Sequence, residues 1–153
     1  MDLVDIQFEI AKHLPLIDVL LLNKYRIFNV KINIREEIER RFTFIGVLFG
    51  EYLLSILLTP RDEDLIYMPN GVDIISKDSH LPGYDLHTMK FHNGIPMLTY
   101  RNGNEKVNLF WIKDCTVEEV MDSLDSDLLR CHYDGTTLYI KDPKMVHEYL
   151  MPS

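Results

Sequence analysis

GEYLLSILLTPRDEDLIY, residues Gly50–Tyr67, is the stretch of the sequence that decides the fold. It begins at a glycine, continues as an apolar run and ends in two aspartates two positions apart, Asp62 and Asp64. Three interpretations fit this pattern: the end of a membrane span, a helix in a protein core, and the remains of a metal-binding active site. The rest of the chain separates them.

The composition favours one ordinary domain, or a small helical piece joined to a domain of about 100 residues. The chain has 153 residues, of which 46% are hydrophobic, and this is enough for a buried core. Its two cysteines, Cys115 and Cys131, form neither a CxxC motif nor a metal-ligand spacing, and the sequence does not begin with a basic stretch typical of a signal peptide. We therefore expect a cytoplasmic or nuclear protein.

The net charge of −8 is unevenly distributed along the chain. Residues 1–41 contain seven acidic and seven basic side chains, so all of the net negative charge lies in residues 42–153. An acidic surface repels the phosphate backbone of nucleic acids, and we expect no binding to a duplex. The change in charge near residue 41 also predicts two domains, residues 1–41 and residues 42–153.

A membrane span is the first interpretation that the sequence disfavours. The apolar stretch Phe42–Thr59 has eighteen residues, whereas a span needs about 20. Glu51 lies in its middle, and a carboxylate at that depth is costly in lipid. The run Phe42–Phe49 instead predicts a buried strand, and Tyr52–Leu58 predicts a buried helix of about two turns.

The first 41 residues predict three short helices. Apolar residues at helical spacing predict the first helix over residues 3–14, and Pro15 ends it. Asp18 is expected to cap the second helix and Asn33 the third.

The remaining residues predict an α+β fold with a mixed or antiparallel sheet and flanking helices. The dipeptides Asn93-Gly94, Asn102-Gly103 and Asp134-Gly135 separate β-rich runs, which is a strong hairpin signal. A capping box at Thr116 predicts a helix over residues 116–124, and Asp142-Pro143 predicts a terminal helix over residues 143–151. The expected strands lie near residues 87–92, 96–101, 106–112, 128–133 and 136–141.

The N-terminal segment DIQFEIAKHLPLIDVLLLNKYRIFNV resembles an F-box, a motif of three helices. Four parts of the motif are in register, although Asp2-Leu3 stands where its leading Leu-Pro pair belongs: Glu9-Ile10, Leu14-Pro15, Asp18-Val19-Leu20 and Lys24-Tyr25. The resemblance implies docking onto the Skp-type adaptor of a ubiquitin ligase, as an amphipathic helix docks in a groove. The partner-binding residues implied are Ile10, Leu14, Pro15, Leu20 and Leu21. The alternative is that these helices simply pack on the second domain.

The opening stretch resembles the nucleotidyltransferase fold. Enzymes with that fold carry Gly-Ser or Gly-Gly at the start of a helix and then Asp-x-Asp on the next strand. Here Gly50 is followed by Asp62 and Asp64, and two carboxylates at i and i+2 on a strand point to one face. The resemblance implies that Gly50 lies at the phosphate and that both aspartates bind Mg²⁺. A solvated turn is the alternative for TPRDED.

The later segment KVNLFWIKDCTVEEVMDSLDSDLLRCHYDGTTLYIKDP resembles poorly characterised proteins of large DNA viruses, although their Phe-Asp pair is absent. A viral origin and a host-cell location are therefore expected. The catalytic equipment of the nucleotidyltransferase family is incomplete in this chain. Glu51 replaces a serine that binds phosphate, and Asn108 stands where a third carboxylate is expected. Asp73 or Asp85 are candidates to replace the missing group.

Two functions follow from the sequence. The first is a non-enzymatic adaptor without a cofactor, which binds a protein through its F-box-like helices and carries a catalytically eroded nucleotidyltransferase-like domain. The second is a Mg²⁺-dependent nucleotidyltransferase that acts on RNA, a protein or a small molecule. We expect the adaptor, because Glu51 and Asn108 both disfavour turnover.

Overall fold

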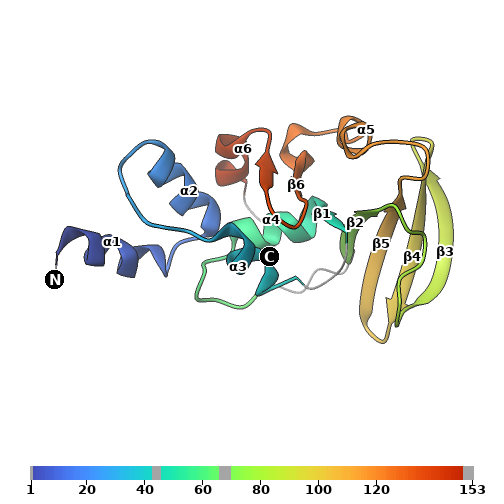
Figure 1. Cartoon of the computed structure of the whole chain (residues 1–153), viewed down its shortest axis with the longest axis horizontal. Helices are drawn as coiled ribbons and strands as arrows, with labels where there is room; N and C mark the ends of the chain where they lie inside the picture. The colour runs from blue at the N-terminus through green and yellow to red at the C-terminus, as the bar shows by residue number, and fades with distance from the viewer. Residues whose placement is uncertain (1, 43–45, 66–69, 150–153) are drawn as a thin grey trace.

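The computed structural model describes residues 2–42, 46–65 and 70–149 and has an α+β fold (Figure 1). The helices are α1 (Leu3–Ala11), α2 (Leu16–Lys24), α3 (Ile34–Glu39), α4 (Gly50–Leu58), α5 (Val117–Asp122), the 3₁₀ turn η1 (Asp127–Leu129) and α6 (Pro143–Glu148). The strands are β1 (Val47–Phe49), β2 (Val72–Ser76), β3 (Asp85–His92), β4 (Ile95–Asn102), β5 (Glu105–Trp111), β6 (Cys131–Tyr133) and β7 (Leu138–Ile140).

The seven strands form one mixed sheet in the order β3-β4-β5-β2-β1-β6-β7. The pair β2 and β5 is parallel, and the other neighbours are antiparallel. The hairpin between β3 and β4 turns at Asn93 and Gly94, which both have positive φ, as the sequence predicts. The mixed sheet with flanking helices is thereby confirmed.

Both faces of the sheet are covered over its central strands. On one face, α4 contributes Leu53 and Leu57 to a core that includes Leu109 of β5. On the other face, α5 contributes Val120 to a second cluster around Phe110. The apolar stretch that contains α4 is thus a core segment, and among the described residues no helix is long and apolar enough to cross a membrane.

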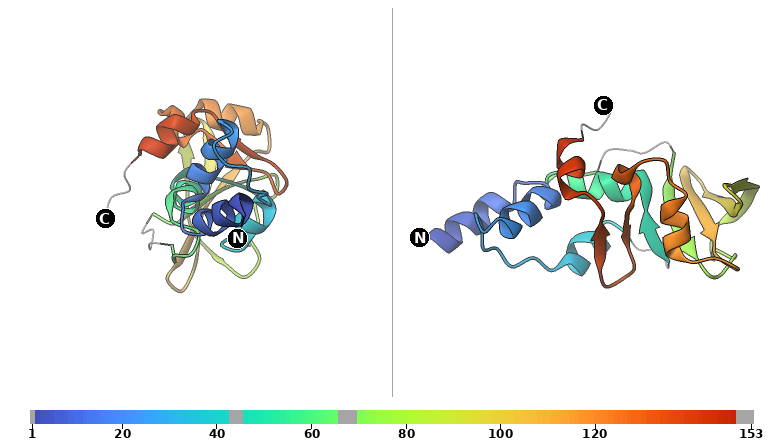
Figure 2. Two further views of the ribbon diagram at one scale, coloured as in Figure 1. Left: turned by 90° about the vertical axis from the view of Figure 1, so that its left-hand side faces the viewer. Right: turned by 90° about the horizontal axis from the view of Figure 1, so that it is seen from above.

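The N-terminal helices differ in how they meet this body. Leu16 and Ile17 of α2 and Ile38 of α3 belong to the same buried cluster as α4. In contrast, Ala11 is the one residue of α1 that is buried. Helix α1 therefore extends from one end of the molecule, and β3 forms the opposite end (Figures 1 and 2).

The predicted caps are confirmed at three helices. The side chains of Asn33, Thr116 and Asp142 each accept a hydrogen bond from a backbone N–H in the first turn of α3, α5 and α6. The predicted cap at Asp18 is wrong. Helix α2 begins at Leu16, directly after Pro15, so Asp18 lies within its first turn. The helix starts earlier than predicted because its first two residues, Leu16 and Ile17, are buried.

Several predicted boundaries also differ from the structure; the terminal helix predicted over residues 143–151, for example, ends at Glu148, and residues 150 and 151 lie outside the described residues. The first helix ends at Ala11 rather than at residue 14, and the 3₁₀ turn η1 occupies the first part of the strand predicted over 128–133. Strand β1 begins at Val47, and residues 43–45 of the strand predicted for Phe42–Phe49 lie outside the described residues.

Candidate functional site

A polar cluster surrounds the first residue of α4. Gly50 has a φ of +76°, and a Cβ atom on it would lie 2.5 Å from Oδ2 of Asp73. Only glycine fits here without strain, because it tolerates positive φ and has no side chain to meet the carboxylate. The antiparallel register of β1 and β2 causes this proximity, since it places Phe49 opposite Asp73.

Asp73 is held by an amide from the neighbouring parallel strand. Nδ2 of Asn108 donates hydrogen bonds to Oδ1 of Asp73 at 2.9 Å and to the backbone oxygen of Asn70 at 3.0 Å. Oδ1 of Asn108 accepts a hydrogen bond from Oγ1 of Thr99 at 3.1 Å. Because Nδ2 meets two acceptors, the orientation of the amide follows from its hydrogen bonds.

The electrostatic environment keeps a proton on Asp73 in mildly acidic solution. Burial raises the pKa of Asp73 to about 6, and the hydrogen bond from Asn108 opposes this rise. The nearby carboxylate of Glu51 also contributes to this raised pKa of Asp73, whereas the charges of Lys106 and His92 oppose it. The cluster therefore resists additional negative charge, including that of a phosphate.

The cluster is also a poor fit for Mg²⁺ between Asp73 and Asn108. Mg²⁺ takes oxygen ligands in strict geometry. Asn108 turns its NH₂ group toward Asp73 and directs its oxygen to Thr99. The groups around Asp73 therefore do not fit a Mg²⁺ ion. Among the described residues, no group of three or more His, Cys, Asp and Glu side chains is arranged to hold a metal ion.

Asp62 and Asp64 lie outside the polar cluster formed by Gly50, Asp73 and Asn108. The prediction that they occupy a strand is wrong, because they follow α4 in a turn and an irregular segment, and the next strand is β2. Residues 66 and 67 of the opening stretch lie outside the described residues. Oδ2 of Asp62 lies 2.5 Å from Nδ1 of His13, and this hydrogen bond lowers the pKa of Asp62. Gly50 is at the other end of α4, a helix about 13 Å long.

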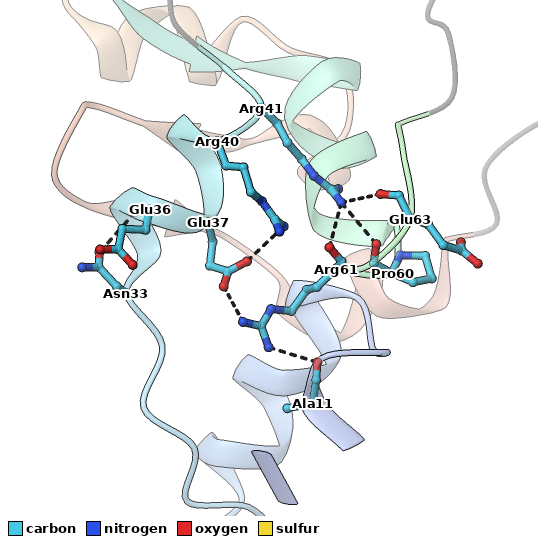
Figure 3. A network of polar contacts seen from close by, with 9 residues as sticks. All are labelled: Ala11, Asn33, Glu36, Glu37, Arg40, Arg41, Pro60, Arg61 and Glu63. Carbon is cyan, nitrogen blue, oxygen red and sulfur yellow. Dashed lines mark hydrogen bonds and ion pairs between the residues drawn. The ribbon is translucent and has the colours of Figure 1, made fainter. Parts of the chain in front are cut away.

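The turn that carries these aspartates joins the N-terminal helices to the body (Figure 3). The Arg61 side chain donates hydrogen bonds to Glu37 of α3 and to the backbone oxygen of Ala11, the latter at 3.0 Å. One guanidinium nitrogen of Arg41 lies 3.2 Å from the backbone oxygen of Pro60 and 2.6 Å from that of Glu63. These contacts give the turn a structural role.

An apolar surface on α1 is the second candidate site. Leu3, Ile6 and Ile10 lie on one side of the helix and are 68%, 42% and 45% exposed. Val4 and Phe8 are also exposed, at 57% and 46%, but lie on another side of the helix. We name Leu3, Ile6 and Ile10 the α1 surface. Exposed apolar side chains that occur singly are ordinary, but five on a nine-residue helix are typical of a binding surface.

The other predicted partner-binding residues are less accessible than Ile10. Leu14, Pro15, Leu20 and Leu21 are half-buried. Leu20 and Leu21 pack against the main core, and Leu14 packs against a small cluster around Ala11. Their role in partner binding stays a prediction, and the exposed surface lies mainly on the preceding helix.

Sequence reasoning located part of the polar cluster. Of the two aspartates that are candidates to replace the missing group, Asp73 is the one that lies beside Gly50 and Asn108. The other, Asp85, lies at the start of the outer strand β3 and pairs with Arg101. The signal that identifies Asp73 is a single acidic residue within the short β-rich run that follows Asn70-Gly71.

Comparison of the chain with protein-family models, with curated proteins and with solved structures finds no match.

Proposed function

We propose that this chain is a non-enzymatic adaptor that binds a protein partner through the α1 surface. The observation that carries this proposal is the exposure of Leu3, Ile6 and Ile10 along one side of a helix that buries only Ala11 against its own body. A helix is ordinarily stabilised by packing of its apolar side, so this side is suited to packing against another protein.

The chemistry of α1 defines the kind of partner. Asp5 and Glu9 border the side of the helix that carries Leu3, Ile6 and Ile10, and Nζ of Lys12 lies 3.0 Å from Oε1 of Glu9. A suitable partner therefore has an apolar groove with a polar rim. The F-box resemblance of residues 5–30 suggests a Skp-type ubiquitin-ligase adaptor, with the half-buried leucines of α2 at the edge of the contact.

The rest of the chain holds α1 in place. Helix α2 packs against α4 and α6, and Nδ1 of His147 in α6 lies 2.5 Å from Oδ1 of Asp18 in α2. At the end of α1, Arg61 holds the backbone of Ala11. An adaptor benefits from such anchoring, because a positioned helix loses less freedom when it binds.

The test is calorimetric titration of the full chain with a purified Skp-type adaptor. We compare the wild type with the triple variant Leu3→Ser, Ile6→Ser and Ile10→Ser. The matched control replaces three equally exposed apolar residues at the other end of the molecule, namely Leu86, Met89 and Phe91, with serine.

We expect the α1 variant to bind more than about tenfold more weakly than the wild type, and the control variant to bind as the wild type does. Equal binding by the two variants would refute the role of α1, and absence of binding by the wild type would refute this partner. Circular dichroism spectra of all three proteins establish that the substitutions leave the fold intact.

A Mg²⁺-dependent nucleotidyltransferase is the second candidate function. The proximity of Gly50, Asp73 and Asn108 favours it, whereas the charge of Glu51 and the orientation of the Asn108 amide argue against it. Calorimetry with Mg²⁺ and nucleoside triphosphates tests this alternative. Metal-dependent binding that Asp73→Ala abolishes would support a site at Gly50. Loss of binding only in the double variant Asp62→Ala and Asp64→Ala would support the predicted metal ligands instead.

A further inference from the structure

Strand β3 is the long outer edge of the sheet. It has eight residues, all of them exposed, and among the described residues β4 is its one neighbour in the sheet. The strand at the other edge, β7, has three residues. A strand with a single neighbour directs the N–H and C=O groups of alternate residues away from the sheet, where an added strand can pair with them.

One face of β3 carries an apolar stripe. Leu86, Met89 and Phe91 pair with Tyr100, Leu98 and Pro96 of β4, so all three lie on the same face of the sheet. Their exposed fractions are 56%, 57% and 67%. We name these three residues the β3 stripe. It presents alternate apolar side chains beside a free strand edge, which is the combination that strand addition uses.

A groove extends this surface past the end of the strand. It has a volume of about 480 Å³, and its lining combines apolar side chains with charged ones of both signs: Phe91, Pro96, Trp111, Lys113, Asp114, Cys115 and Glu119. An added strand that runs along β3 can therefore place one further apolar side chain in this groove. The groove gives the surface a preference for sequence that backbone pairing alone does not provide.

The net charge of the hairpin β3–β4 differs in sign from that of the whole protein, although Asp114 and Glu119 line the groove at its end. Residues 85–102 contain one acidic side chain, Asp85, and two basic ones, Lys90 and Arg101. Asp85 stands opposite Arg101 in the register of β3 and β4, at one end of the strand, whereas Lys90 lies in the regular part of β3 opposite the uncharged Met97. On a chain with a net charge of −8, this edge favours an acidic ligand.

A second copy of the chain fits this edge poorly. An irregularity in register between Leu86 and Thr88 leaves Thr88–His92 as the regular part of β3. A two-fold antiparallel pairing of this part with itself places Lys90 directly opposite Lys90 of the second copy. Like charges in that position are destabilising, and the two copies each carry a charge of −8.

We propose that β3 binds an extended segment of another protein by strand addition, with apolar residues of that segment against the β3 stripe and an acidic residue opposite Lys90. This inference goes beyond the proposed binding of a partner by α1 and does not depend on it. The two surfaces lie at opposite ends of the molecule (Figure 1). In an adaptor that binds one protein through α1, the site at β3 would bind the second protein.

The test uses the full chain and two acetylated, fluorescein-labelled hexapeptides at physiological salt. One peptide alternates valine with glutamate, and the other alternates valine with lysine. Fluorescence anisotropy measures their affinities, and hydrogen exchange measures the protection of the β3 amides. The variants are Lys90→Glu and the charge-matched control Lys31→Glu, which changes an exposed lysine in the N-terminal part of the chain.

We expect the wild type to bind the glutamate peptide about tenfold more tightly than the lysine peptide, and this peptide to slow hydrogen exchange in residues 85–92. Lys90→Glu should reverse the preference, while Lys31→Glu and the α1 triple variant should preserve it. Equal binding of the two peptides, equal effects of the two lysine substitutions, or unchanged exchange in β3 would each overturn the proposal. Sedimentation experiments test the oligomeric state of the chain. If the wild type forms dimers and Phe91→Ser abolishes them, a second copy occupies the edge of β3, and the proposal is overturned as well.

Discussion

The contact between Gly50 and Asp73 gives the sharpest prediction about the polar cluster. In Gly50→Ala, the new Cβ atom would lie 2.5 Å from Oδ2 of Asp73, at a backbone φ of +76°. The positive φ costs about 1 kcal/mol for a residue with a side chain. Overpacking against a carboxylate that Asn108 holds in place adds about 2 kcal/mol. We therefore expect Gly50→Ala to lower the free energy of unfolding by about 3 kcal/mol.

Gly83 provides the matched control. Its φ is +82°, and a Cβ atom there would meet no other atom within 4 Å. Gly83→Ala should therefore cost only the backbone contribution of about 1 kcal/mol. The difference between the two variants, about 2 kcal/mol, measures the contact with Asp73 alone.

A double-mutant cycle tests whether this difference in unfolding free energy arises from the contact with Oδ2 of Asp73. In an Asp73→Ala background the crowding oxygen is absent, so Gly50→Ala should cost about 1 kcal/mol, as Gly83→Ala does in the wild type. Urea unfolding followed by circular dichroism gives the free energies from the transition midpoints. Equal losses for Gly50→Ala and Gly83→Ala, or the same loss for Gly50→Ala in both backgrounds, would refute the reasoning.

Three further predictions concern charge and burial. Arg61→Gln should lower the free energy of unfolding by about 3 kcal/mol, because it breaks a largely buried ion pair, whereas Arg35→Gln, which breaks an exposed pair, should leave the urea midpoint nearly unchanged. The folded-state pKa of Asp73, about 6, exceeds its ordinary value of 3.8, so its contribution to the free energy of unfolding should fall as pH rises between these values. Asp73→Asn should therefore be more stable than the wild type by about 3 kcal/mol at pH 7 and should lose this advantage below pH 4 in urea titrations. Burial raises the pKa of Cys131 to about 12, so a thiol reagent should modify Cys115 in the native protein and Cys131 only after unfolding; equal rates would contradict this.

Local signals explain why much of the fold was predictable. The hairpin at Asn93-Gly94 and the caps at Asn33, Thr116 and Asp142 each depend on residues a few positions apart. Turn geometry and cap hydrogen bonds are decided at that range, so the sequence is sufficient to place them.

Long-range contacts explain where prediction failed. Aspartates at i and i+2 suit both a strand and a turn, and the contact of Asp62 with His13 joins residues 49 positions apart. The closeness of Asp73 to Gly50 likewise follows from the register between β1 and β2. A short β-rich run does not specify which strand becomes its neighbour, so the site around Asp73 could be predicted only in part.

Helical periodicity has a related ambiguity that bears on function. Leu3, Ile6 and Ile10 recur at helical spacing, which indicates an apolar side but not what covers that side. In this fold the chain itself covers the apolar side of α4 and leaves that of α1 exposed.

The separation of the α1 surface from the β3 stripe makes the two proposed contacts independent. One lies on α1 and the other on the edge strand β3, at opposite ends of the molecule (Figure 2). Distant sites without shared neighbours contribute additively to free energy unless an element between them has two alternative arrangements. Because α4 and the central strands form a continuous buried core, occupation of one surface should leave the affinity of the other unchanged. We therefore expect the proposed adaptor to hold two partners at a fixed distance, without either one altering the binding of the other.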